Sequence, residues 1–268
     1  MTRILRIADI QTSEVLYFDP EFKERCYEFC KKRNIDFLPS LDDATQIYVR
    51  DDERTDFRKK TVDATQTIDG FRRAFDLTVL EVFRANPLLF VYTQGEFSGV
   101  VHYSDFNKSV VSTYLFEVLF QYERTLRVFL QECGLRNADM IEFFRAKASA
   151  AKTEKKRRFY ESKVNDYTAQ AFEIADYPPF QTFYLDDLIS LANMRGLCLS
   201  PNVVVLRNDV MHVHDLVGKD SGTTDSYIFR FDGFEAFFRR AVALHHDLVM
   251  VRNRVAFMKG LDEIVSFE

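Results

Sequence analysis

Residues 114–130 read YLFEVLFQYERTLRVFL, and this stretch divides the chain into two kinds of structure. Its apolar residues recur at steps of three and four, which is the spacing of one buried face on a long helix; they are Leu115, Val118, Leu119, Tyr122, Leu126, Phe129 and Leu130. Short strand-like runs and turns precede this stretch, whereas helical spacing continues after it. We therefore expect an α+β protein, with an α/β region over residues 1–110 and a mostly α-helical bundle over residues 111–268.

Four further helices are expected in the second region from the same spacing rule. They cover approximately residues 138–171, 185–194, 206–217 and 234–258. Gly196 and Gly260 follow two of them at the position of a C-terminal cap glycine. Residues 227–231 are expected to form a short strand.

The first region begins with a strand-like run, EVLYF, at residues 14–18. Asp19 and Pro20 then start a helix as N-cap and first-turn residue, and Asn34 ends it. Strands are expected at residues 35–38 and 46–49. The highly charged stretch from about 51 to 60 is expected to be a surface connection.

A second unit with a similar order of elements follows. Residues 79–84 have a helical pattern, and residues 88–92 form an apolar run. A tight turn at residues 94–96 joins that run to a hairpin partner at residues 97–102, and Asp105 is expected to cap a new helix. The repeated order indicates a weak internal duplication of about 50 residues.

Composition limits the classes of function. The 268 residues are 47% hydrophobic with a net charge of −5, so a core can be buried but no overall positive field attracts nucleic acid. No apolar stretch of about 20 residues predicts a membrane span, and the start lacks a secretory pattern, so a cytoplasmic location is expected. The four cysteines are interpreted as reduced, packed thiols.

The end of the second unit contains a short motif, Gly99-Val-Val-His-Tyr-Ser-Asp105. A strand that ends where an acidic residue starts a helix places a carboxylate beside free N–H groups, which suits a ribose next to a phosphate. The motif resembles that of CBS domain pairs, with His102 in place of the usual Ser or Thr. The resemblance covers residues 1–110 and implies an adenine nucleotide bound by Gly99 and Asp105. The alternative is that the CBS-like pair has lost its ligand and serves only a structural role.

The second motif is Leu206-Arg-Asn-Asp-Val-Met-His212, on an expected helix. A histidine can exchange a proton near neutral pH, and a guanidinium can hold a phosphate and its developing charge. Arg207, His212 and the polar Asn208 therefore suit RNA cleavage without a metal. The alternative without catalysis is that Arg207 is a helix-surface charge and that His212 is a buried histidine with satisfied hydrogen bonds.

The phrase RNDVMH resembles the Arg-x4-His signature of the HEPN superfamily, and the helices from about 112 to 260 resemble its bundle. The resemblance implies that Glu123 approaches the Arg207 and His212 pair, with Arg127 a weaker choice. It also implies a homodimer whose two motifs meet in one cleft, and cleavage of RNA to a cyclic phosphate end.

A second HEPN-like phrase lies at residues 251–257, VRNRVAF, with Arg252 but with Phe257 in place of histidine. If this phrase occupied the motif position, the site would lack its acid and base. A metal site could be imagined from His212, His214 and residues 245–247, but their spacing completes no ligand set, and no metal is expected. RNA is further expected to contact Arg252 and a basic run, which consists of Lys155, Lys156, Arg157 and Arg158. A solvated helix face is the alternative explanation of the run.

These patterns together predict a metal-independent endoribonuclease that needs no cofactor and is regulated by an adenine nucleotide on the first region. The alternative from another functional class is a non-catalytic regulatory protein that binds a nucleotide or RNA at the same residues.

Overall fold

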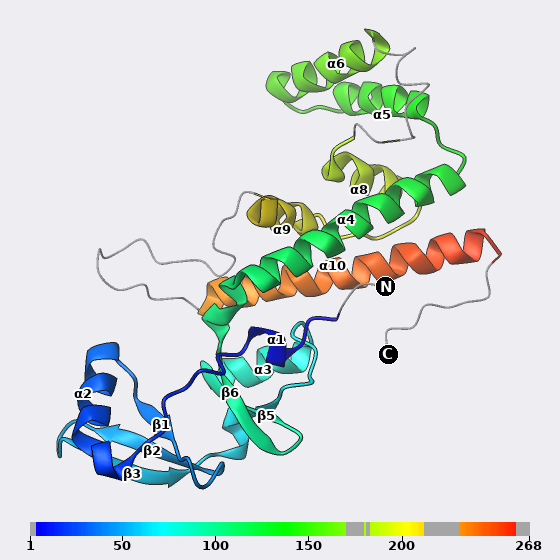
Figure 1. Ribbon diagram of the computed structural model, residues 1–268. Coiled ribbons are helices and arrows are strands. Elements are labelled where there is room, and N and C mark those ends of the chain that lie inside the picture. Colours follow the sequence, from blue (N-terminus) through cyan, green and yellow to red (C-terminus); the bar gives the residue numbers. More distant parts are fainter. Residues whose placement is uncertain (1–3, 170–179, 181–182, 212–230, 261–268) are drawn as a thin grey trace. The chain divides into compact units, whose positions relative to one another are not determined.

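The computed structural model describes residues 4–169, 180, 183–211 and 231–260, which form two compact units (Figure 1). Within the described residues, unit 1 comprises 4–115 and 231–242, and unit 2 comprises 116–169, 180, 183–211 and 243–260. Unit 1 contains two three-stranded sheets, whereas unit 2 is helical as far as it is described. The expected mixed α+β class is confirmed.

The first sheet of unit 1 is antiparallel, in the order β1 (Phe37–Pro39), β2 (Gln46–Asp51) and β3 (Asp56–Thr61). Helix α1 (Ile7–Ile10) and the 3-10 turn η1 (Pro20–Phe22) precede α2 (Lys23–Arg33). As expected, the Asp19 carboxylate caps this turn, and Asn34 ends α2 in the left-handed conformation. A small core holds α2 to the sheet, and its buried members are Phe18, Cys26, Cys30 and Leu38.

Two expectations for this sheet were wrong. Residues 14–18 are not a strand, because only Phe18 forms a bridge, to Ser40. The charged stretch is not a simple connection either, since Asp56–Thr61 is the edge strand β3. Four of its six residues are exposed, and charged side chains on an edge strand discourage pairing with other chains. The high charge of this stretch therefore led to a wrong prediction, because β3 is an edge strand that pairs with β2 alone among the described strands.

The second sheet has the order β4 (Thr67–Asp69), β5 (Leu88–Thr93) and β6 (Glu96–His102). Strand β4 follows the 3-10 turn η2 (Ala64–Gln66) and runs parallel to β5, and α3 (Leu77–Ala85) connects them. Strands β5 and β6 form the expected antiparallel hairpin. Gln94 and Gly95 both have positive φ, 57° and 85°, which is the backbone of a two-residue hairpin turn.

The two sheets repeat one topology. In each, a short parallel bridge precedes a helix, and an antiparallel pair of strands follows it. Strand β1 begins at residue 37 and β5 at 88, while β2 begins at 46 and β6 at 96. This offset matches the duplication of about 50 residues inferred from the sequence, and strand β3 is the addition to the first copy.

The core of unit 1 is rich in phenylalanine. After β6, the 3-10 turn η3 (Tyr103–Asn107) places Phe106 beside Phe83 of α3, at 6.0 Å between ring centroids. Phe234 lies 5.2 Å from Phe106, and Phe238 lies 5.8 Å from it. These last two residues belong to the first turns of α10 (Phe231–Met258). Residues far apart in sequence thus close the core of unit 1.

Unit 2 contains the main part of α4 (Ser109–Glu132) and of α10, together with α5 (Asn137–Ser149), α6 (Glu154–Ala169), α8 (Leu185–Met194) and α9 (Asn202–Met211). Within this unit α4 and α10 run side by side in the same direction (Figure 1). The Tyr122 hydroxyl of α4 donates to the Asp247 carboxylate of α10, and Glu132 at the end of α4 forms an ion pair with Lys259, just after α10.

The single helix expected over residues 138–171 is wrong, because the chain turns at residues 150–153 and forms the hairpin of α5 and α6. No Gly or Pro marks this turn. Thr153 starts α6 instead, since its hydroxyl accepts from the Lys156 N–H. Phe144 of α5 then stacks on Tyr167 of α6, at 5.5 Å and 7° between the rings.

Two other expected helices, at 185–194 and 234–258, are confirmed. The helix at 185–194 is confirmed as α8, with Gly196 at positive φ behind it. The long final helix is confirmed and starts at Phe231, so the expected strand at 227–231 does not include that residue, while its other members lie outside the described residues. Of the helix expected at 206–217, the described part lies in α9. Among the helices that the structure describes, none has an apolar stretch long enough to cross a membrane.

Candidate functional sites

Helix α9 carries the described part of the Arg-x4-His motif. Val203, Leu206 and Val210 are buried on one face of the helix. Arg207 is half-buried and Asn208 is exposed, and the Arg207 Nη1 donates to the Asn208 Oδ1 at 3.4 Å. The arginine and its asparagine neighbour are therefore adjacent at the surface. His212 and His214 lie outside the described residues.

Arg207 has no carboxylate partner among the residues that the structure describes. Some other arginines of unit 2 do have one, such as Arg145 with Glu142 and Arg158 with Glu154 at 2.8 Å, whereas Arg195 also lacks one among the described residues. A guanidinium without a nearby carboxylate keeps its positive charge available for an anion. The geometry of α9 therefore suits contact with a phosphate or another oxyanion.

The start of α9 is fixed to α10 by a buried carboxylate. Asp247 is 2% exposed, and its Oδ2 accepts from the Ser200 N–H at 2.8 Å and from the Tyr122 hydroxyl at 3.5 Å. Burial raises the pKa of the Asp247 carboxyl, and burial beside that carboxyl also raises the pKa of Tyr122. His246 lies 3.7 Å from the other Asp247 oxygen but is itself exposed. This network positions the helix that carries Arg207.

Glu123 belongs to α4 and pairs with another residue. Its Oε2 lies 3.3 Å from the Arg127 Nη2, and the Arg127 Nε donates to the Phe180 carbonyl at 3.0 Å. No hydrogen bond or ion pair links Glu123 or Arg127 to Arg207, all three of which are described. The structure therefore places these residues in a separate contact that holds Phe180 against α4.

Arg252, the arginine of the second HEPN-like phrase, is half-buried on α10. Its Nη2 donates to the Gln121 Oε1 on α4, and burial lowers the pKa of the guanidinium. Phe257 is 76% exposed at the position where a histidine would complete the motif. Arg252 thus links α4 to α10.

The basic run on α6 divides into two pairs. All four residues are exposed. Arg157 and Arg158 share the Glu154 carboxylate, so their charge is partly compensated. Lys155 and Lys156 have no side-chain partner in the described part of the chain. The lysines are therefore the members of this run that are free to meet a nucleic acid backbone.

Gly99 and Asp105 have structural partners in unit 1. A Cβ atom on Gly99 would lie 2.4 Å from the Thr12 carbonyl oxygen, so glycine allows the two segments to pair. Asp105 was expected to be a helix cap, but the N-cap is His102; the Asp105 Oδ2 accepts from the His102 N–H at 2.7 Å. The other oxygen lies 3.1 Å from the Lys108 Nζ. Both carboxylate oxygens are thus engaged.

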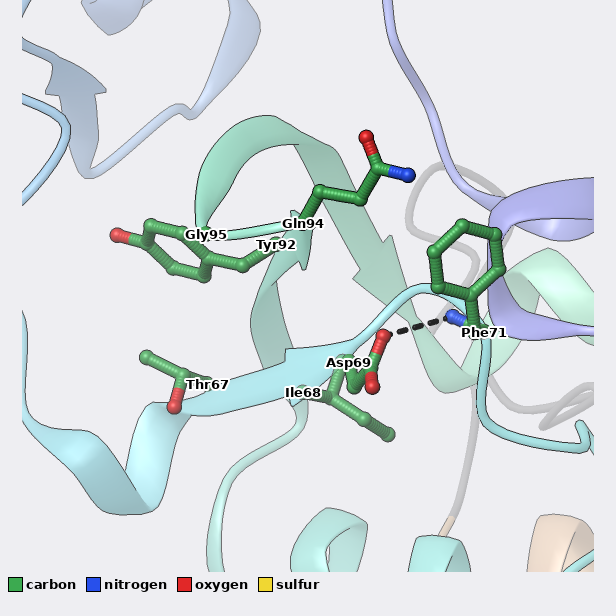
Figure 2. Close-up of a pocket in the computed structure, with 7 residues that line it drawn as sticks. All are labelled: Thr67, Ile68, Asp69, Phe71, Tyr92, Gln94 and Gly95. Atoms are coloured by element: carbon green, nitrogen blue, oxygen red, sulfur yellow. Dashed lines mark hydrogen bonds between the residues drawn. The ribbon is translucent and has the colours of Figure 1, made fainter.

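A pocket of about 390 Å³ opens at the other end of the same sheet (Figure 2). Its lining residues are Thr67, Ile68, Asp69, Phe71, Tyr92, Gln94 and Gly95. His102 pairs with Leu88 at one end of the hairpin, whereas Thr93 pairs with Glu96 at the end beside the pocket. Five residue steps of a strand span about 17 Å. The sequence motif around Asp105 therefore did not indicate this pocket.

Among the described residues, no group of three or more His, Cys, Asp or Glu side chains is arranged to hold a metal ion. Comparison with protein-family models, curated proteins and solved structures found no match to this chain.

Proposed function

We propose that the chain is a metal-independent endoribonuclease in which Arg207 binds the scissile phosphate, His212 transfers protons and Asn208 orients them. The observation that supports this most is the Arg207 guanidinium, which has an asparagine neighbour and no described carboxylate partner. His212, five residues after Arg207 in the motif, supplies a group that exchanges protons near pH 7.

The reaction requires a ribose 2′-hydroxyl to attack the adjacent phosphorus. The 2′-oxygen loses its proton to a base and forms a bond to phosphorus, while the bond from phosphorus to the 5′-oxygen breaks and that oxygen gains a proton. A cyclic phosphate and a 5′-hydroxyl result. Arg207 would stabilise the added negative charge. In a homodimer, two copies of His212 would serve as the base and the acid.

Regulation by an adenine nucleotide at Gly99 and Asp105 remains a proposal, in which a ribose hydroxyl would share the Asp105 carboxylate with the His102 N–H and the Lys108 Nζ. The basic side chains proposed to guide RNA are Lys155 and Lys156, because Glu154 compensates the two arginines beside them.

The proposal is tested by comparing Arg207→Ala with Arg195→Ala, which removes an exposed arginine elsewhere in unit 2. Both variants and the wild type are incubated with total RNA and a chelator. Loss of a single donor to the transition state costs about 100- to 1,000-fold in rate, and this is expected for Arg207→Ala alone. Equal cleavage by all three proteins would contradict the role of Arg207. If no protein cleaves but RNA binding depends on Arg207, the non-catalytic binding protein is the better description.

A further inference from the structure

The pocket beside the β5–β6 turn is built by two adjacent strands of unit 1. Ile68 and Asp69 end strand β4, and Tyr92 lies near the end of β5, where it pairs with Asp69 in parallel register. Gly70 allows the close approach of the strands, since a Cβ there would lie 2.4 Å from the Thr93 Oγ1. The wall of the pocket is therefore part of the sheet.

Two aromatic rings and one carboxylate give the pocket its chemistry. Figure 2 shows the Phe71 and Tyr92 rings on opposite sides of the opening, with the Asp69 carboxylate below it and the Gln94 amide above it. Phe71 is 46% exposed although it is a large apolar residue. An exposed ring at the mouth of a pocket offers a flat surface for a planar ligand.

The hydrogen-bonding groups favour a ligand that donates. One Asp69 oxygen accepts from the Phe71 N–H at 2.9 Å, and the second oxygen has no partner among the described residues. The Tyr92 hydroxyl is used, since it donates to the Ala44 carbonyl at 2.5 Å. No lysine or arginine lines the pocket. Arg6, whose guanidinium lies 5.4 Å from the Phe71 ring centre, is outside the lining.

We propose that this pocket binds a small planar nitrogen compound, neutral or positively charged, whose N–H groups face Asp69 and whose ring packs against Phe71. A phosphate would meet the Asp69 carboxylate without a lining cation, so the phosphate of a nucleotide is expected to add nothing to binding. The site is separate from Arg207 and does not depend on the proposed nuclease activity.

Benzamidine is a suitable probe, because it is planar, cationic and rich in N–H donors, and benzoate is its anionic counterpart of the same shape. Binding of each to the full chain is measured by titration calorimetry or ligand-observed NMR. Saturable binding of benzamidine but not of benzoate is expected. Adenosine is expected to bind at least as well as adenosine monophosphate. Binding of neither benzamidine nor adenosine, or equal binding of benzamidine and benzoate, would overturn the proposal.

Two variants locate the site. Asp69→Asn removes the charge but keeps an oxygen for the Phe71 N–H, and a loss of about 10-fold or more in benzamidine affinity is expected for a charge-assisted contact. Asp63→Asn is the matched control, because Asp63 forms the same kind of turn, with the Thr65 N–H at 2.8 Å, outside the pocket. Phe71→Leu should also weaken binding. Unchanged affinity in both pocket variants would place the probe elsewhere.

Discussion

Asp247 illustrates how one buried residue fixes the start of α9, the helix that carries Arg207. Its carboxylate is 2% exposed and accepts the Ser200 N–H at the start of α9. A buried N–H without an acceptor costs about 1–3 kcal/mol. The hydrogen bond from Ser200 to Asp247 therefore holds the start of α9, and with it Arg207, in place. In the sequence, Asp247 stands beside His246 and suggests no more than a metal ligand. Its partners Ser200 and Tyr122 come from other elements, and no local pattern indicates them.

The charge of Asp247 predicts a pH dependence of stability. Burial raises its carboxyl pKa above the unfolded value of about 3.9, so between these two values the folded chain binds more protons than the unfolded chain. The contribution of this group to the free energy of unfolding therefore falls as pH rises through that interval. In Asp247→Asn, which keeps an acceptor for Ser200, this contribution should disappear.

The measurement is denaturant unfolding of wild type and Asp247→Asn from about pH 4 to neutral pH. The difference in stability, wild type minus variant, should decrease as the pH rises. Repeating the comparison with His246→Ala in both proteins removes the histidine whose Nδ1 lies 3.7 Å from the carboxylate. A difference that is constant, or that grows with pH, would show that burial does not raise the pKa of this group.

At the scale of elements, the hairpin of β5 and β6 was predictable and the edge strand β3 was not. The hairpin combines two apolar runs with a Gln94-Gly95 turn, and both signals agree with the final pairing. Strand β3 is dominated by exposed charged residues and is ordered by pairing with β2. The α5–α6 hairpin was not predictable either, because the sequence between those helices contains no Gly or Pro. Stacking of Phe144 on Tyr167 stabilises it instead.

Gly99 provides a test of whether the glycine of the front motif serves the fold. The Cβ of Gly99→Ala would collide with the Thr12 carbonyl at 2.4 Å, so a loss of about 1–3 kcal/mol in unfolding free energy is expected. Gly134→Ala is the control, since its Cβ would meet nothing within 4 Å and only its positive φ of 75° adds strain, about 1 kcal/mol. Thermal or urea unfolding measures both. A smaller loss for Gly99→Ala than for Gly134→Ala would contradict the packing role.

At the scale of the whole molecule, α4 and α10 each contribute residues to both units. Periodicity predicted that both helices are long, because their buried residues recur at helical spacing. It did not predict that Phe234 and Phe238 of α10 complete the core around Phe106. Such contacts join residues more than 100 positions apart, and they depend on packing that a single sequence does not display.

The candidate sites also differ in whether the sequence alone indicates them. The RNDVMH phrase is local, so the sequence indicates Arg207 and Asn208 directly, and α9 brings these two together. Glu123, which was expected near this pair, bonds Arg127 instead, and Arg252 of the second HEPN-like phrase bonds Gln121. The pocket at Asp69 needs two strands and a turn that meet only in the folded chain, and its residues form no motif.

The most direct test of the central claim compares RNA cleavage by wild type, His212→Ala and His214→Ala in the presence of a chelator. The second variant removes a neighbouring histidine and controls for loss of a ring in this segment. Loss of general acid–base catalysis costs about 100- to 10,000-fold. We predict this loss for His212→Ala alone, with RNA binding retained and cyclic phosphate ends in the wild-type products. Cleavage by His212→Ala at the wild-type rate, or no cleavage by the wild type, would contradict the account.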